Sequence, residues 1–334
     1  MADESTLTTI AHPELSPEIN NDSDNASLSS GGTDYASLRS SVLDYEYENG
    51  RRYQSYRKGE YLFPNDADEQ DRMDFLHHIY SMIFGGKLHL APLENFSGRI
   101  LDLGTGTGIW AIDFADEHPA AEVIGNDLSP IQPGWVPPNC VFEVDDFEAD
   151  WHYTKPFDFI HGRSLAGAVK DMDRLTKQAF ENLKPGGYLE LKSIGMATFC
   201  DGDQEGYLKK APSTNQMCRL IHEASSKFGK QMQDFSGWEE SLKAAGFVDI
   251  VADVVKVPMS AWPKDPKQRD IGRFTYSVTI QGFHSLLPKL LVDILGWTPL
   301  EVTVLISKVK QELADVSIHQ YFKLYSFYAR KPVT

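Results

Sequence analysis

The sequence predicts an α/β domain built around a seven-stranded, mostly parallel sheet, and three observations lead to this prediction. Short apolar segments alternate with helical segments over residues 99–194, and parallel strands need such crossover helices. The apolar segment 99–103 runs through a glycine-dense turn directly into a helical pattern. Two further apolar segments, 248–257 and 321–328, fit an antiparallel edge added to the parallel sheet.

The individual elements follow from this alternation and from turn signals. The predicted strands are 99–103, 121–126, 141–144, 157–161, 188–194, 248–257 and 321–328. The predicted helical segments are 109–117, 171–183, about 204–232, 237–245 and about 266–314. The sequence Lys184-Pro185-Gly186-Gly187 predicts a tight turn ahead of the fifth strand.

A helical cover is predicted ahead of the sheet, over residues 45–94. Pro64-Asn65 offers a helix start, and the acidic residues of the next turn suit the positive end of the helix dipole. Apolar residues follow at helical spacing until Gly85-Gly86, where the helix is expected to end. Residues 1–44, rich in Ser, Asp, Asn and Thr, predict a disordered acidic tail.

The turn after the first strand indicates which ligand the domain binds. A dinucleotide fingerprint needs G-x-G-x-x-G, but its third glycine would fall at position 109, which is isoleucine. The glycines alternate instead, at Gly104, Gly106 and Gly108, and Asp102 precedes them. This pattern suits S-adenosylmethionine (SAM), which has no pyrophosphate but carries an ammonium and a carboxylate. An NAD-dependent oxidoreductase is therefore the weaker interpretation.

Acidic residues follow the second and third strands, where open α/β sheets bind ligands. Asp127 ends the second strand, where its carboxylate can accept both ribose hydroxyls, although a helix cap ahead of Leu128 is the alternative. Asp146 and Phe147 follow the third strand and would border the adenine. Thr105 and Leu128 complete the predicted binding set, together with Asp102 and the first two glycines at the methionine end.

Composition excludes several functional classes. The net charge of −16 argues against direct binding of DNA or RNA, because nucleic-acid binding relies on basic residues that neutralise phosphates. No apolar run approaches the roughly 18–20 residues needed to span a bilayer, and no secretory signal begins the chain, so we expect a cytoplasmic or nuclear protein without membrane association. Three widely spaced cysteines argue against a disulfide framework and against a zinc site, and no metal is expected.

Together these blocks resemble the fungal LaeA-like, SAM-dependent class I methyltransferases. The matching segments, over residues 45–200, are YRKGEYLFPNDADEQDRMDFLHH, LDLGTGTGIW, GNDLSPIQPGWVPPN, DDFEADW, FDFIHGRSL and LKPGGYLEL. The resemblance implies a Rossmann-like methyltransferase domain over 95–334, with helical inserts near 200–235 and 262–316. It also implies SAM as the cofactor.

The resemblance implies site residues beyond those already named. His161 and Arg163 fall where the transferable methyl group and the acceptor meet. Tyr56 belongs to the N-terminal cover that such enzymes fold over the cofactor, and Arg57 is expected to pair with the cofactor carboxylate. Family members include enzymes of secondary-metabolite clusters and nuclear regulators that associate with velvet proteins.

Methyl transfer from a sulfonium chiefly requires alignment and exclusion of water. A general base is needed only when the acceptor must lose a proton, and His161 is the first prediction for it. The alternative is a histidine bonded to backbone at the strand end. Glu190, inside the fifth strand, either lines the pocket or pairs with Lys192. Two functions follow: a methyltransferase acting on O, N or S of a small molecule, or a regulator acting through velvet-type partners.

Overall fold

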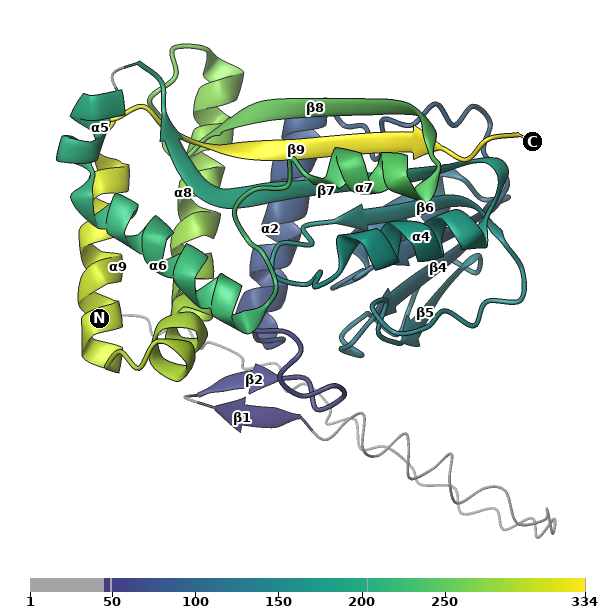
Figure 1. Cartoon of the computed structure of the whole chain (residues 1–334), viewed down its shortest axis with the longest axis horizontal. Helices are drawn as coiled ribbons and strands as arrows, with labels where there is room; N and C mark the ends of the chain where they lie inside the picture. The colour runs from purple at the N-terminus through teal and green to yellow at the C-terminus, as the bar shows by residue number, and fades with distance from the viewer. Residues whose placement is uncertain (1–44, 49, 203, 334) are drawn as a thin grey trace, which may run out of the picture. The chain divides into compact units, whose positions relative to one another are not determined.

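A computed structural model of the chain describes residues 45–48, 50–202 and 204–333 (Figure 1). The predicted acidic tail, residues 1–44, lies outside these residues. Within them strands and helices follow one another from residue 99 onward, except that the strands Glu122–Asp127, Cys140–Val144 and Phe157–Arg163 are joined by loops without a helix between them. None of the helices in the described ranges is long and apolar enough to cross a membrane.

The seven strands form one sheet in the order β5-β4-β3-β6-β7-β9-β8. Its strands are β3 (Arg99–Leu103), β4 (Glu122–Asp127), β5 (Cys140–Val144), β6 (Phe157–Arg163), β7 (Leu183–Cys200), β8 (Val248–Pro258) and β9 (Gln320–Arg330). The first five strands in this order pair in parallel, and β9 is antiparallel to both of its neighbours. The predicted seven-stranded, mostly parallel sheet is confirmed, with the reversed strand one position in from the edge.

The predicted turn at residues 184–187 does not separate a helix from a strand, because β7 already begins at Leu183. Phe157 pairs with Leu183, and Phe159 pairs with Tyr188. Residues 184–187 of β7 therefore stand opposite Asp158 alone. Gly186 has a φ of 82°, which glycine adopts without strain. The turn is therefore a wide irregularity inside one long strand.

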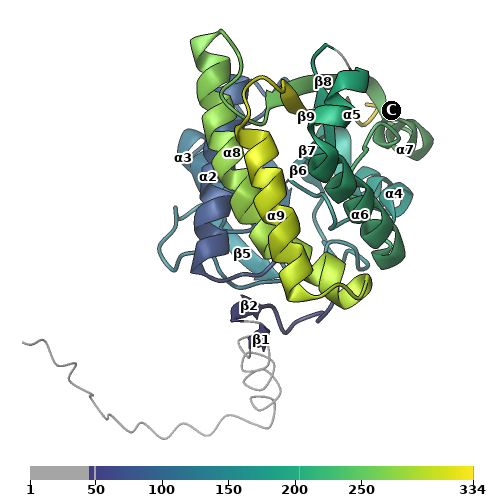
Figure 2. The same ribbon diagram turned by 90° about the vertical axis from the view of Figure 1, so that its left-hand side faces the viewer.

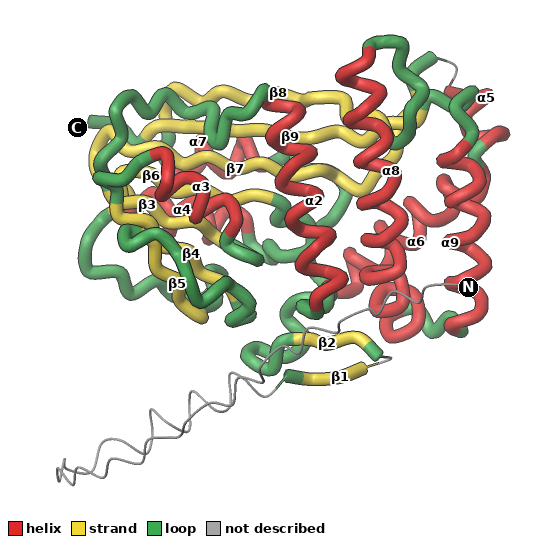
Figure 3. The backbone as a smooth tube through the Cα atoms, turned by 180° about the vertical axis from the view of Figure 1, so that it is seen from behind, coloured by secondary structure: helices red, strands yellow, loops and turns green. Residues whose placement is uncertain are grey.

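Helices cover both faces of the sheet. They are α2 (Ala67–Phe84), α3 (Ile109–Glu117), α4 (Met172–Asn182), α5 (Gln204–Lys210), α6 (Pro212–Phe228), α7 (Trp238–Ala245), α8 (Pro266–Leu287), the π-helix η1 (Pro288–Ile294) and α9 (Pro299–Ala314). Helices α4 and α7 lie on one face, and α2 and α3 lie on the other (Figures 1 and 3). The helical inserts place α8 against α2 and against α9 (Figure 2).

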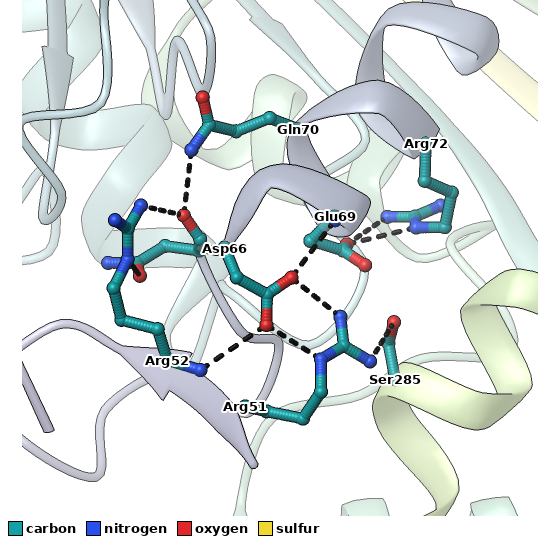
Figure 4. Close-up of polar contacts among 8 residues, drawn as sticks. Arg51, Arg52, Asp66, Glu69, Gln70, Arg72 and Ser285 are labelled. Carbon is teal, nitrogen blue, oxygen red and sulfur yellow. Dashed lines mark hydrogen bonds and ion pairs between the residues drawn. The ribbon is translucent and has the colours of Figure 1, made fainter. Parts of the chain in front are cut away.

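The N-terminal cover starts with a hairpin that the sequence reading did not predict. Strands β1 (Glu46–Glu48) and β2 (Arg51–Tyr53) pair antiparallel ahead of α2. Arg51 donates from Nε and Nη2 to the Asp66 carboxylate, at 2.6 and 2.9 Å, and from Nη1 to Ser285 Oγ on α8 (Figure 4). Asp66 also caps α2 by accepting from the Glu69 N–H, so one carboxylate joins the hairpin to α2.

A buried ion pair fastens the segment after α2 to the sheet. Glu190 and Lys192 on β7 are 0% and 1% exposed and contact each other. Glu190 Oε2 accepts from the backbone N–H groups of Leu90 and Ala91, at 2.7 and 2.6 Å. Of the two alternatives for Glu190, the structure therefore supports the pair with Lys192.

Replacing Glu190 by alanine leaves the Lys192 ammonium buried without its carboxylate. We expect the free energy of unfolding to fall by about 3–5 kcal/mol, measured by urea denaturation. The double substitution Glu190→Ala with Lys192→Met removes both charges and should be clearly more stable than the single variant. A double variant no more stable than the single one would contradict this account.

Candidate functional site

A cavity of about 220 Å³ opens where β3, β4, β5 and β6 end, which is the expected ligand position in an open α/β sheet. Its floor is the turn after β3 and the residues that follow the other three strands. Helices α2, α3 and α8, strands β7 and β9, and the segment ahead of α2 contribute to its remaining walls. The cavity therefore brings together the sheet, the N-terminal cover and the second helical insert.

The turn after β3 has glycine at three positions where other residues would be strained. Gly104, Gly106 and Gly108 have φ values of 61°, 61° and 80°. A Cβ atom on Gly106 would lie 3.1 Å from Met73 Sδ, and one on Gly108 would lie 2.4 Å from Phe142 Cζ. The turn therefore brings bare backbone to the cavity while α2 packs directly over it.

Asp127, at the end of β4, holds this turn. Its Oδ2 accepts from the Gly106 N–H and its Oδ1 from the Ser129 N–H, both at 2.9 Å. Burial raises the pKa of Asp127 to about 6. Asp127 lines the cavity, and each carboxylate oxygen has a second lone pair. The carboxylate can therefore fix the turn and still accept hydroxyl groups of a ligand.

Asp102 is fixed by two side chains. Thr105 Oγ1 donates to Asp102 Oδ2 at 2.6 Å, and His161 Nδ1 lies 2.7 Å from Oδ1. Burial raises the pKa of Asp102 to about 7 and lowers the pKa of His161 well below its usual value. Asp102 and Thr105 line the cavity.

The structure places the side chain of His161 in the core. The side chain is 0% exposed, stacks on Trp110 with ring centroids 3.6 Å apart, and does not line the cavity. A general base must come within hydrogen-bond reach of the proton it removes, and this histidine is turned into the core instead. In this structure the protein contact of His161 is therefore Asp102, and its role as a general base stays a prediction.

The two residues predicted to border adenine, Asp146 and Phe147, follow β5 and line the cavity. Leu128, another member of the predicted binding set, follows Asp127 and also lines it. Asp146 Oδ1 accepts from the Glu148 N–H at 2.9 Å, which fixes the carboxylate at the end of its strand. Phe147 is 8% exposed and lies close to the turn at Gly104.

Arg163, Tyr56 and Arg57 were also predicted at the site, and of these three Arg163 lines the cavity. Arg163 contacts His77 Nδ1 from Nη2 at 3.0 Å, and burial lowers the pKa of Arg163. Tyr56 and Arg57 are absent from the lining. Arg57 is half-exposed, with Nε 3.5 Å from Asp146 Oδ2. Arg57 therefore pairs with Asp146 in this structure, and its pairing with a cofactor carboxylate stays a prediction.

The cavity wall formed by α2 and α8 was not predicted from the sequence. The residues of these helices that line it are Glu69, Arg72, Met73, Leu76, His77 and Ile79, with Thr275, Val278, Thr279, Gly282 and Phe283. Their three- and four-residue spacing indicates one helix face. It does not indicate what that face contacts.

The sheet order, the glycine turn and the acidic strand ends define a class I, SAM-dependent methyltransferase. A family model described as "Methyltransferase domain" matches residues 53–250. The chain belongs to this methyltransferase family.

Curated relatives extend the match over nearly the whole chain. "Methyltransferase pytC" of Aspergillus terreus is 42% identical over 331 residues, covering 98% of this chain and 99% of that protein. "Secondary metabolism regulator LAE1" of Cochliobolus heterostrophus is 36% identical, covering 85% of this chain and 94% of that protein. "Secondary metabolism regulator laeA" of Aspergillus flavus is 35% identical, covering 85% and 77%. The predicted LaeA-like resemblance is confirmed.

Gly104→Asp should abolish binding of S-adenosylhomocysteine, the demethylated cofactor, in isothermal titration calorimetry. The new side chain would occupy the cavity and would strain a residue whose φ is 61°. Gly134→Asp is the matched control, because Gly134 is exposed and a Cβ atom added there would meet no other part of the chain within 4 Å. Unchanged affinity in a cooperatively folded Gly104→Asp protein would contradict the assignment of this turn to the cofactor.

Proposed function

We propose that this methyltransferase transfers the methyl group of SAM to an oxygen, nitrogen or sulfur atom of a small, mainly apolar molecule of secondary metabolism. The observation that carries the proposal is the continuity of the cavity. Its acidic, glycine-rich part at the strand ends continues into an apolar part between α2 and α8. One cavity thus offers a cofactor subsite and an acceptor subsite.

The residues of the first part fit SAM. The backbone at Gly104 and Gly106 lies bare against the cavity because neither residue has a Cβ atom. In the proposed arrangement Asp127 accepts the ribose hydroxyls, and Asp146 with Phe147 borders the adenine. Asp102, Gly104, Thr105, Gly106 and Arg163 hold the methionine part. The bound cofactor supplies a methyl group already activated on a sulfonium.

Apolar side chains dominate the second part of the cavity. They are Leu76 and Ile79 on α2, Ile194 and Met196 on β7, Val278 and Phe283 on α8, and Phe322 on β9. An apolar enclosure excludes water and aligns an acceptor by burial, which is most of what an in-line methyl transfer requires. It suits a small organic molecule better than a polar metabolite.

No side chain in this enclosure is assigned as a general base. His77 lines the cavity, but Nδ1 is bonded to Arg163 and Nε2 lies 3.0 Å from Asp113 Oδ2. Both ring nitrogens therefore have protein partners. An amine or a thiolate can be methylated without a base, and these acceptor types fit the site directly.

The relatives support secondary metabolism as the setting. One is named a methyltransferase and two are named secondary metabolism regulators. The second candidate function, favoured by the latter two, is a regulator in the nucleus or cytoplasm that acts through velvet-type protein partners. Both functions use the same cofactor site, so experiments on the acceptor separate them.

The affinity for S-adenosylhomocysteine should decrease as the pH falls through about 6. The pKa of Asp127 is raised to about 6, so the carboxylate is ionised above this pH and loses its charge below it. Asp127→Asn should weaken binding at pH 8 by about 1–3 kcal/mol and remove the pH dependence centred near 6. Calorimetry between pH 5 and 8 measures both effects, and an unchanged pH profile in the variant would contradict the ribose assignment.

Incubation of the purified protein with methyl-labelled SAM and a fungal small-molecule extract should transfer label to a low-molecular-weight product, detected by mass spectrometry. The Gly104→Asp protein is the negative control, because it lacks the cofactor subsite. Affinity capture from fungal lysate tests the second candidate. Recovery of transcriptional regulators without any labelled product would favour the regulator over the enzyme.

A further inference from the structure

A buried ion pair lines the wall that α2 gives to the cavity. Glu69 and Arg72 lie one turn apart on α2, and both line the cavity. Arg72 donates to Glu69 Oε1 from Nε at 2.9 Å and from Nη2 at 2.5 Å (Figure 4). The side chains are 1% and 11% exposed, in a wall that is otherwise mainly apolar.

One oxygen of this pair has no protein partner. Both bonds from Arg72 go to Oε1 of Glu69, and among the described residues Oε2 is buried without a hydrogen bond. A buried carboxylate oxygen is costly to leave unpaired, since it has lost its water without gaining a donor. The neighbouring carboxylate, Asp66, differs because both of its oxygens accept hydrogen bonds from the protein.

A second unpaired polar group lies on the facing helix. Thr275 on α8 lines the same cavity, is 3% exposed, and has no partner for Oγ1 within the described residues. Helix α8 packs along α2, so each helix contributes an unpaired polar atom to the lining of the same cavity. Such atoms in an apolar pocket fix the orientation of a ligand.

We propose that Glu69, held by Arg72, is the specificity-determining residue of the acceptor pocket, where Oε2 accepts a hydrogen bond from a hydroxyl or N–H group of the acceptor. The acceptor class is therefore an apolar molecule that carries at least one such donor. An analogue without the donor leaves the buried oxygen unpaired and is rejected. This inference rests on the proposed methyltransferase function and names the substrate class for it.

Three matched probe pairs test the inference in the full chain saturated with S-adenosylhomocysteine. They are 7-hydroxycoumarin with 7-methoxycoumarin, 1-naphthol with 1-methoxynaphthalene, and indole with 1-methylindole. In the wild type, we expect the donor-bearing member to bind at least about fivefold tighter by ligand-detected NMR titration. Glu69→Gln replaces the unpaired carboxylate oxygen by an amide N–H group. It should bring the ratio of the two affinities within each pair to about one.

Asp68→Asn is the matched control. Asp68 is the preceding residue of the same helix turn, is exposed, and undergoes the same change of charge. This variant should keep the wild-type preference, and both variants should bind S-adenosylhomocysteine as the wild type does. A preference that persists in Glu69→Gln overturns the inference. It is also overturned if no donor-bearing probe binds to the protein saturated with S-adenosylhomocysteine.

Two outcomes separate this inference from the function on which it rests. If the wild type does not bind S-adenosylhomocysteine, the proposed function fails and the inference fails with it. If Glu69→Gln does not fold, a crystal structure of the wild type with S-adenosylhomocysteine and 7-hydroxycoumarin tests the inference instead. The inference requires the probe hydroxyl within hydrogen-bond distance of Glu69, and a hydroxyl placed elsewhere overturns it.

Discussion

The hydrogen bond from the Gly106 N–H to the Asp127 carboxylate is the contact on which the rest of the site depends. It joins the turn after β3 to the end of β4, and so fixes bare backbone beside a buried acid. The turn holds left-handed φ values that only glycine adopts without strain. Because Met73 of α2 packs against Gly106, the same contact sets how closely the cover approaches the sheet.

The sheet, the glycine turn and the acidic strand ends could be predicted because their signals are local. Apolar segments bounded by turns predicted each strand of the sheet, and parallel strands bring their carboxyl ends to one edge whatever the loops do. Asp102, Asp127 and Asp146 therefore meet at the cavity, as predicted from their positions after strands. The family match then confirmed the class of enzyme.

The remaining site could not be predicted because it depends on tertiary packing. His161 follows the pattern of a strand-end residue, yet its side chain packs on Trp110 inside the core. Arg57 pairs with Asp146, a contact between segments about 90 residues apart that no local pattern indicates. The hairpin before α2 carried a usable signal, an Asn49-Gly50 pair between short segments, which is typical of tight hairpins. The cavity faces of α2 and α8 had no comparable local signal.

A crystal structure with bound S-adenosylhomocysteine tests the central claim most directly. The account requires the ribose hydroxyls within hydrogen-bond distance of Asp127, and the homocysteine part beside the turn at Gly104 and Gly106. It also requires the sulfur to face the apolar enclosure between α2 and α8. A ribose bound away from Asp127, or a sulfur directed away from that enclosure, would contradict the account.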